Sequence, residues 1–352
     1  MNRKNILVIF GGCSPEHGVS LQSAQSVLEH IDREKYAVTI LGINREGKWY
    51  RYSGPVSEIS SGRWQDKRYC TPAAILPDRG ERSLALFHDT AVERVKIDAA
   101  LPILHGKNGE DGTVQGLLEL AGVPVVGCGA LSSALCMDKR RAHLLASLAG
   151  AAVPQGAVFS KGASREELEA AAERLGCPLF VKPVRAGSSF GITRVSGPGQ
   201  LAGAAEEAFR HDREILLEEA VPGFEAGCAV MGNPGETPLF AGAVDEIELS
   251  GGFFDFEEKY TLRTSAIHCP ARISPEKAAE IQEAARTVYA ALDCRVFARV
   301  DFFLTPEGRV VFNEVNTIPG FTAHSRYPAM MRAAGLEFSA LLDRLVELGV
   351  GA

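Results

Sequence analysis

The stretch RVDFFLTPEGRVVFNEVNTIPGFTAHSRY, residues 299–327, carries the strongest structural signal in the chain. Two apolar runs, residues 297–304 and 309–315, flank a Thr-Pro-Glu-Gly sequence whose Pro and Gly supply the backbone angles of a tight reversal. This pattern predicts a β-hairpin with Glu307 and Gly308 at the centre of its turn.

Four polar side chains meet on one face of the predicted hairpin. Because side chains alternate faces along a strand, Asp301 would lie opposite Glu314, and Arg299 opposite Asn316. Such a face is costly to bury unless its charges are compensated, and its oxygen ligands suit Mg²⁺, which takes one or two carboxylates together with phosphate oxygens and water. We therefore expect a magnesium-nucleotide site. The alternative is a solvated face with a surface ion pair, since a slip of one residue would turn every side chain over.

The bulk composition is that of a multi-domain α/β protein. A chain of 352 residues exceeds the usual single core, so two or three domains are expected. A formal net charge of −7 gives no general attraction to nucleic acid or to an anionic membrane. The dispersed cysteines show no zinc spacing and are expected to be reduced. The apolar run before Gly11 is too short for a signal peptide or a membrane span, so we expect a cytoplasmic protein.

Residues 1–130 are predicted to form an N-terminal domain with a parallel sheet. The apolar runs NILVIF and IDAALPIL each end in a glycine-rich loop followed by a helical pattern. Such loops at the carboxyl ends of parallel strands are where open α/β sheets bind ligands, although many of them bind nothing. The first loop carries Glu16 and the second carries His105. Residues 54–94 are polar and irregular, and only an excursion is predicted there.

Residues 131–217 are predicted to form a second domain. Its first helix is expected over residues 131–149, with Ser132 or Ser133 as N-cap. Lys139 lies inside this helical pattern, where a lysine is by default exposed.

The stretch KPVRAGSSFG, residues 182–191, lies between two predicted strands of the second domain. Its glycines let the backbone approach a ligand, Ser188 and Ser189 add hydroxyl donors, and Lys182 supplies a positive charge. The Walker A pattern is absent from the chain. We expect a phosphate-binding hairpin, with a flexible surface hairpin as the alternative.

Residues 218–352 are predicted to form a third domain that contains the metal hairpin. The strand around Glu218 could bind an adenine edge and a ribose hydroxyl, or could simply connect two domains. Residues 249–270 lack a helical period, and loops of this length are usually functional lids or disordered. Aromatic residues such as Phe254 and Tyr260 argue against disorder, so a lid over the site is expected.

Seven motifs follow one another along the chain: G-G-x-S-x-E, H-G-x-x-G-E-D-G, M-D-K, V-K-P-x-x-x-G-S-S-x-G, E-K-Y, R-x-D and N-E-x-N-T-x-P-G-x-T-x-H-S. Together they resemble the D-alanine–D-alanine ligase family of ATP-grasp enzymes over nearly the whole chain. Within that family they look closest to the vancomycin-resistance D-alanine–D-serine ligases of the VanG type. The resemblance implies an α/β (α+β) protein with a three-domain ATP-grasp fold, in which an N-terminal parallel-sheet domain precedes two antiparallel sheets that hold ATP.

The resemblance also implies the ATP and metal ligands. Two Mg²⁺ ions, which Mn²⁺ could replace, would be held by Asp301, Glu314 and Asn316. The ATP phosphates and the nucleoside would be contacted by Lys139, Lys182, Ser189, Lys259, Glu218, Val221 and Glu225.

The remaining matches concern the two substrates. Glu16 matches the anchor of the first substrate's ammonium group, with His105 nearby, and Glu16, Ser188 and Tyr260 match a hydrogen-bonded triad that closes the site. Arg299 and the backbone N–H of Gly320 match the donors to the oxyanion that forms in the second step. The residue that holds the second substrate's carboxylate is matched by Ser325.

One position departs from the common pattern of the family. Arg326 stands where D-alanine-specific members usually carry Leu, and a guanidinium can donate to a hydroxyl group. With Phe254 shaping the pocket, Arg326 would favour D-serine over D-alanine as the second substrate. The expected activity is ATP-dependent ligation of D-alanine to D-serine through D-alanyl phosphate, for peptidoglycan precursors and vancomycin resistance. The alternative is a housekeeping D-alanine–D-alanine ligase. The Glu-Lys-Tyr lid disfavours D-lactate, and the family suggests a homodimer.

Two other classes of protein are disfavoured by the sequence. An ATP-grasp binding protein without catalysis is disfavoured because the metal and oxyanion positions are all filled. A dinucleotide-binding oxidoreductase is disfavoured because the first glycine loop lacks G-x-G-x-x-G.

Overall fold

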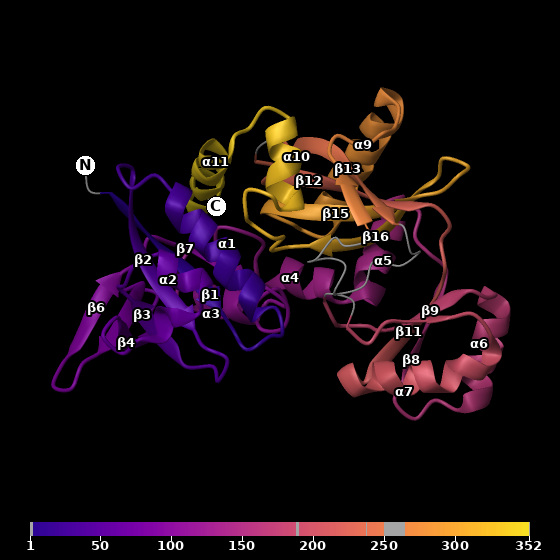
Figure 1. Ribbon diagram of the computed structural model, residues 1–352, viewed down its shortest axis with the longest axis horizontal. Helices are drawn as coiled ribbons and strands as arrows, with labels where there is room; N and C mark the ends of the chain where they lie inside the picture. Colours follow the sequence, from indigo (N-terminus) through magenta and orange to yellow (C-terminus); the bar gives the residue numbers. More distant parts are fainter. Residues whose placement is uncertain (1–2, 188–189, 237, 250–264, 352) are drawn as a thin grey trace.

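The computed structural model describes residues 3–187, 190–236, 238–249 and 265–351. In these residues the chain forms three β-sheets with helices packed against each of them (Figure 1). The N-terminal sheet and the second sheet lie at opposite ends of the long axis, and the third sheet lies between them (Figure 1).

The N-terminal sheet is larger than the sequence indicates. Its strand order is β6-β5-β4-β3-β2-β1-β7, with β1 parallel to both β2 and β7 and the other pairs antiparallel. Residues 54–94, predicted only as an excursion, contribute β4 and β5 and the start of β6. The strands are β1 Lys4–Gly11, β2 Tyr36–Ile43, β3 Trp49–Tyr52, β4 Cys70–Ile75, β5 Ser83–Phe87, β6 Val92–Lys96 and β7 Ala99–Leu104.

Helices cover both faces of the parallel part of this sheet. Alternate β1 side chains pack with α1 (His17–His30) on one face and with α3 (Thr113–Leu120) on the other. The short helices α2 (Ser57–Ser60) and η1 (Arg63–Gln65) follow β3. The last helix, α11 (Phe338–Val350), returns to pack beside α1 (Figure 1). One hydrophobic core therefore joins the two ends of the chain.

The helical pattern at residues 131–149 forms two helices and not one. α4 (Ala130–Met137) begins after Gly129, so the predicted N-caps Ser132 and Ser133 are wrong. Asp138 interrupts the helix and caps α5 (Lys139–Leu148) by accepting a hydrogen bond from the backbone N–H of Arg141 at 3.0 Å. Lys139 is thus the first residue of a new helix, and it is buried.

The second sheet is antiparallel, with strand order β10-β9-β11-β8. Its two helices pack on one face around a separate apolar core, and a capping box of Ser164 and Glu167 opens the first of them. As predicted, the stretch beginning at Lys182 connects two antiparallel strands. The elements are β8 Gly156–Ser160, α6 Arg165–Leu175, β9 Leu179–Pro183, β10 Thr193–Val195, η2 Pro198–Gln200, α7 Leu201–His211 and β11 Glu214–Glu219.

The third sheet is antiparallel, with strand order β14-β13-β12-β15-β16. Helix α9 packs on one face, and α10 lies against β12 and β13 on the other (Figure 1). The elements are β12 Phe224–Gly232, β13 Phe240–Leu249, β14 Ser265–His268, α9 Pro275–Ala291, β15 Val296–Leu304, β16 Val310–Asn316 and α10 Arg326–Ala333. Each sheet lies mainly within one predicted domain, although β11 crosses the predicted boundary at 217/218; the boundaries at 130/131 and 217/218 stay predictions.

In the part of the chain that the structure describes, no helix is long and apolar enough to cross a membrane.

Candidate active site

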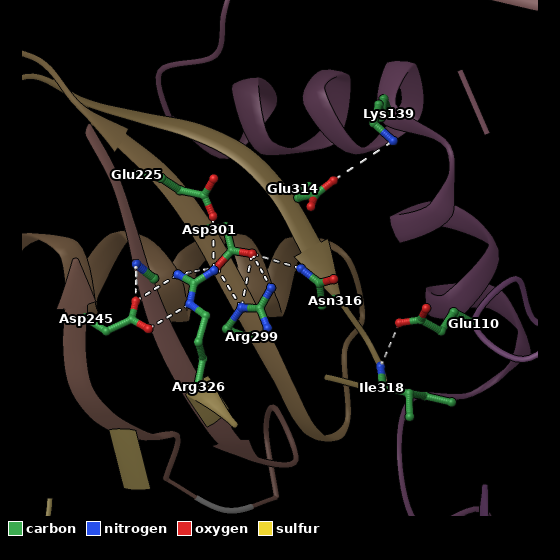
Figure 2. Close-up of polar contacts among 11 residues, drawn as sticks. Glu110, Lys139, Glu225, Asp245, Arg299, Asp301, Glu314, Asn316, Ile318 and Arg326 are labelled. Carbon is green, nitrogen blue, oxygen red and sulfur yellow. Dashed lines mark hydrogen bonds and ion pairs between the residues drawn. The ribbon is translucent and has the colours of Figure 1, made fainter. Parts of the chain in front are cut away.

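The hairpin of β15 and β16 has the predicted register. Asp301 pairs with Glu314, and Arg299 pairs with Asn316. A β-bulge follows Asp301 and shifts the pairs nearer the turn by one residue. The four polar residues therefore lie on adjacent strands (Figure 2).

Asp301 is the centre of this face. Its carboxylate accepts hydrogen bonds from Arg299 Nε and Nη2 at 2.8 and 2.7 Å and from Asn316 Nδ2 at 2.8 Å (Figure 2). Arg326 Nη2 lies 3.3 Å from Asp301 Oδ1. Burial opposes the charge of Arg299, but the Asp301 carboxylate outweighs it and raises the pKa of the guanidinium. The negative charge of Asp301 on this face is thus compensated by Arg299 and Arg326.

The donor set fits a divalent metal that is shared with phosphate. Asn316 uses its amide nitrogen on Asp301, which leaves its amide oxygen as a potential ligand. In the described parts of the chain no three His, Cys, Asp or Glu side chains form a closed metal cage. Two carboxylates and an amide oxygen suit Mg²⁺, whose remaining ligands are commonly phosphate oxygens and water. The assignment of Asp301, Glu314 and Asn316 as metal ligands stays a prediction.

Lys139 lies between the Asp301–Glu314 face and the first residues of the predicted phosphate-binding hairpin, residues 182–191. Its Nζ donates to the carbonyl of Ala186 at 2.7 Å and lies 4.0 Å from Glu314 Oε2 (Figure 2). Its backbone N–H donates to the Val184 carbonyl at 3.2 Å. The sequence pattern did not indicate that the helix is interrupted at Asp138. This interruption places Lys139 against the backbone of residues 184–186.

Lys182 and Glu218 form a buried pair across β9 and β11. Glu218 Oε2 lies 3.6 Å from His143 Nδ1, and His143 Nε2 contacts the carbonyl of Asn313 at 2.8 Å. Burial lowers the pKa of His143, so a neutral ring is expected. His143, which was not among the predicted site residues, thus joins Glu218 of the second sheet to Asn313 of the third.

A cavity of about 310 Å³ brings together the predicted substrate residues. They come from three distant segments: the first glycine loop and helix α1, the end of β7, and the segment from β15 to α10. Its walls include Glu16, Ser23, His105, Glu110, Arg299, Asn316, Gly320, Ser325 and Arg326.

Glu16 lies where the first glycine loop comes close to Gly187 of the predicted phosphate-binding hairpin. A Cβ atom at Gly106 would lie 2.4 Å from Glu16 Oε2, so any larger residue there would displace this carboxylate. A Cβ atom at Gly187 would lie 3.6 Å from the same oxygen. Gly187 therefore lies close to Glu16. The predicted contact between Glu16 and Ser188 stays a prediction.

Arg326 begins α10 and is held by three carboxylates. It donates to Asp245 through Nε at 2.7 Å and Nη2 at 2.8 Å, and to Glu225 through Nη1 at 3.0 Å (Figure 2). Burial opposes its charge, but Asp245 and Asp301 outweigh burial and raise the pKa of the guanidinium. Glu225, predicted near the ribose, here contacts Arg326. The partner Asp245 was missed by the sequence analysis, and its only signal is an acidic residue in an apolar strand.

Ser325 and Gly320 lie together at the cavity wall. Ser325 is the N-cap residue of α10, and its Oγ accepts from the backbone N–H of Thr322 at 3.0 Å. A Cβ atom at Gly320 would lie 3.1 Å from Ser325 Oγ. The group predicted to hold the second carboxylate thus lies beside the predicted oxyanion donor.

The remaining predicted residues are Val221 and five that lie outside the described parts of the chain. Val221 lies in the turn between β11 and β12. The predicted lid and triad positions outside the described residues are Ser188, Ser189, Phe254, Lys259 and Tyr260.

The fold and the site define an ATP-grasp ligase. The chain belongs to the D-alanine–D-alanine ligase family: residues 5–128 match the family model "D-ala D-ala ligase N-terminus", and residues 145–347 match "D-ala D-ala ligase C-terminus". As a member, the protein is a D-alanine–D-X ligase that uses ATP and a divalent metal ion. This confirms the predicted family and fold class.

Similar proteins differ in the second substrate that their names give. The crystal structure of the VanG D-Ala:D-Ser ligase from Enterococcus faecalis is 52% identical, covers 99% of both chains and has a TM-score of 0.90. A putative D-alanine–D-lactate ligase of Streptomyces coelicolor is 44% identical, with 99% of each chain covered. A D-alanine–D-alanine ligase of Caldicellulosiruptor bescii is 41% identical over 99% of this chain and 96% of its own. The choice among second substrates must therefore be argued from the site.

Proposed function

We propose that this protein joins the carboxylate of D-alanine to the amine of D-serine through D-alanyl phosphate. The observation that carries the proposal is the position of Arg326. Arg326 lines the cavity next to Ser325, the residue predicted to hold the second substrate's carboxylate. The similarity to the VanG D-Ala:D-Ser ligase supports the same choice.

The first step needs positioning and charge neutralisation. The D-alanine carboxylate attacks the γ-phosphate of ATP, and ADP leaves. Lys139 and Lys182 would bind phosphate oxygens, for which Lys139 exchanges its contact with the Ala186 carbonyl. Divalent metal held by Asp301, Glu314 and Asn316 would neutralise further charge. We propose two Mg²⁺ ions, with Mn²⁺ as a substitute.

The second step needs donors aimed at an oxyanion. The amine of the second substrate attacks the acyl phosphate carbon, a tetrahedral oxyanion forms, and phosphate leaves. Arg299 and the N–H of Gly320 line the cavity and would stabilise that oxyanion. Glu16 would bind the ammonium group of the first D-alanine.

Arg326 is suited to select a hydroxyl group. Its three hydrogen bonds to described residues leave two of its five N–H groups for other contacts, one of which points to Asp301 at 3.3 Å. A polar group that is fixed and buried favours a substrate that pairs with it and rejects one that leaves it unpaired. D-serine offers the hydroxyl and D-alanine does not.

The second candidate is D-alanine as the second substrate, which the D-alanine–D-alanine ligase relatives favour. In that case Arg326 would have a structural role, and its guanidinium would only form ion pairs with Asp245 and Glu225.

We place the reaction in peptidoglycan precursor synthesis in the cytoplasm. A product that ends in D-serine would give a role in vancomycin resistance, as the names of the resistance-protein relatives suggest. A homodimer is proposed from the family alone.

Product analysis tests the proposal. Purified protein is incubated with ATP, Mg²⁺ and equimolar D-alanine, D-serine and D-lactate; products are resolved by mass spectrometry, and phosphate release is followed. Mostly D-alanyl-D-serine is expected. Mostly D-alanyl-D-alanine or D-alanyl-D-lactate would overturn the substrate choice, and no phosphate release would overturn the ligase function.

A further inference from the structure

The segment that carries the predicted oxyanion donor is held by the N-terminal part of the chain. Ile318 donates its N–H to Glu110 Oε1 at 3.3 Å (Figure 2), and its carbonyl contacts His105 Nδ1 at 2.9 Å. Three residues further on, the N–H of Phe321 donates to Ser23 Oγ at 3.1 Å. Three side chains from the first 110 residues thus hold a short segment of the third sheet's domain.

These contacts lie on both sides of the peptide unit that joins Pro319 and Gly320. Of the donors in residues 318–321, those of Ile318 and Phe321 are taken, and Pro319 has none. The remaining donor is the N–H of Gly320, which has no hydrogen-bond partner among the residues that the structure describes. Gly320 lines the cavity. The peptide units before and after it are fixed, so the direction of its N–H is fixed as well.

The hydrogen directions are consistent with a single arrangement. Burial lowers the pKa of His105, which favours a neutral ring with one N–H. Its Nδ1 faces a carbonyl and must carry the hydrogen, so Nε2 is an acceptor. Ser23 Oγ lies 3.4 Å from Nε2, so its hydroxyl can donate to His105 while it accepts from Phe321. The chain of contacts runs from the Ile318 carbonyl through His105 and Ser23 to the Phe321 N–H.

We propose that Ser23, acting with His105 and Glu110, is a positioning residue that aims the Gly320 N–H at the oxyanion of the second step. Ser23 does not touch the reacting atoms in this proposal. It acts through the backbone, and the donor reaches its working direction only when the N-terminal helix α1 packs against the third sheet's domain. The inference rests on the proposed ligase function.

A matched control exists on the same helix. Ser20 and Ser23 are both fully buried serines of α1 whose hydroxyl groups bind backbone. Ser20 Oγ accepts from the Gly11 N–H at 2.7 Å and donates to the Ile103 carbonyl, so its contacts stay within the N-terminal sheet. Ser20→Ala therefore removes a similar structural contact without touching residues 318–321.

The kinetic test separates positioning from general damage. Ser23→Ala is expected to lower kcat by about 10- to 100-fold, less than the loss of an entire oxyanion donor, with KM for ATP and for the first D-alanine changed by less than about twofold. Affinity for a phosphinate dipeptide analogue, whose tetrahedral phosphorus carries an oxygen anion, should fall by a similar factor. Ser20→Ala should leave kcat within about twofold of the wild type. An equal loss in both variants, or unchanged phosphinate affinity in Ser23→Ala, would overturn the proposal.

Amide hydrogen exchange measures how firmly the segment of residues 317–322 is held, and it needs no substrate. Exchange in residues 317–322 should be faster in Ser23→Ala than in the wild type and unchanged in Ser20→Ala. Unchanged exchange in Ser23→Ala would overturn the proposal whatever the enzyme's substrates are. If the wild type makes no dipeptide, the proposed function fails while this reading still decides whether Ser23 holds the segment. Should Ser23→Ala not fold, Ser23→Cys gives the same reading, because a thiol is a weaker acceptor of similar size.

Discussion

The guanidinium of Arg326 and the carboxylate of Asp245 form a two-point pair, with Nε–Oδ2 and Nη2–Oδ1 distances of 2.7 and 2.8 Å. The Asp245 side chain has no solvent exposure, and that of Arg326 is 9% exposed. A side chain as long as arginine is flexible in solution, and this pair holds it at the wall of the substrate cavity. The specificity proposed for Arg326 therefore depends on a residue of a different strand.

The first prediction concerns stability. Arg326→Leu leaves the buried Asp245 carboxylate without its main partner and is expected to lower the free energy of unfolding by about 3 kcal/mol. The double variant Arg326→Leu with Asp245→Leu should recover part of that loss, because the buried Asp245 charge is removed together with its partner, while Glu225 still loses its ion pair with Arg326. Urea unfolding of the wild type, both single variants and the double variant measures this. Additive losses in the double variant would contradict the predicted coupling.

The second prediction concerns selectivity. In Asp245→Asn an amide NH₂ would face a guanidinium N–H, so the two-point pair cannot form and Arg326 loses its fixed orientation. The ratio of D-alanyl-D-serine to D-alanyl-D-alanine should fall by about tenfold, which corresponds to about 1.4 kcal/mol. Glu246→Gln is the control, since Glu246 pairs with Arg272 outside the cavity. An unchanged product ratio in Asp245→Asn would argue against Arg326 as the selecting group.

The third prediction concerns space at Gly227. A Cβ atom there would lie 2.4 Å from Arg326 Nη2 and 2.8 Å from the carboxylate oxygens of Asp245 and Asp301. Gly227→Ala should therefore lower stability by about 1–3 kcal/mol and weaken Mg²⁺ binding, because the network must separate. Gly203→Ala is the control, since a Cβ atom there meets nothing within 4 Å in an exposed part of α7. Thermal unfolding and magnesium titration of activity measure both effects. Equal stability and equal Mg²⁺ dependence in the two variants would show that Arg326, Asp245 and Asp301 can move apart at little cost.

The fourth prediction concerns pH. Burial raises the pKa of Glu110 from 4.5 to about 8, and the negative charge of Glu16 acts in the same direction. The folded state therefore holds a proton that the unfolded state has lost, so this contribution to stability is complete below pH 4.5 and declines as pH rises to about 8.

Glu110→Gln tests this directly, because glutamine does not titrate. The stability difference between wild type and variant should shift against the wild type by up to about 1.4 kcal/mol per pH unit between pH 5 and 8, less where solvent screens the group. Denaturant unfolding at several pH values gives the slope. Parallel curves for the two proteins would mean that Glu110 has an ordinary pKa.

The fifth prediction concerns metal removal. Arg299 and Arg326 already compensate Asp301 without a metal ion. Chelation with EDTA should therefore abolish phosphate release and leave the unfolding midpoint within about 2 °C. A much larger fall in the midpoint would show that the metal is a structural element.

The sequence predicted local relationships well. The register of Asp301 with Glu314 and of Arg299 with Asn316 follows from alternation along two strands and from a turn of Pro and Gly, all within a few residues. The elements that the sequence did not predict, strands β4–β6 and the helix interruption at Asp138, depend on contacts between residues far apart in the sequence. The short strands β4–β6 gain their structure by pairing in series beyond β3 and, for β4 and β5, by packing apolar side chains into the core. The break at Asp138 is stabilised by its cap together with Arg185, which lies 3.5 Å away across the fold.

The sequence by itself determined the family and the register of the hairpin of residues 299–316, because motif order and strand alternation are properties of the chain alone. Tertiary structure decided which charges meet. Asp245 reaches Arg326 across 81 positions, and Ser23 reaches Phe321 across 298. Such pairs form because burial removes water from side chains that folding brings together, so each must find its partner inside the protein.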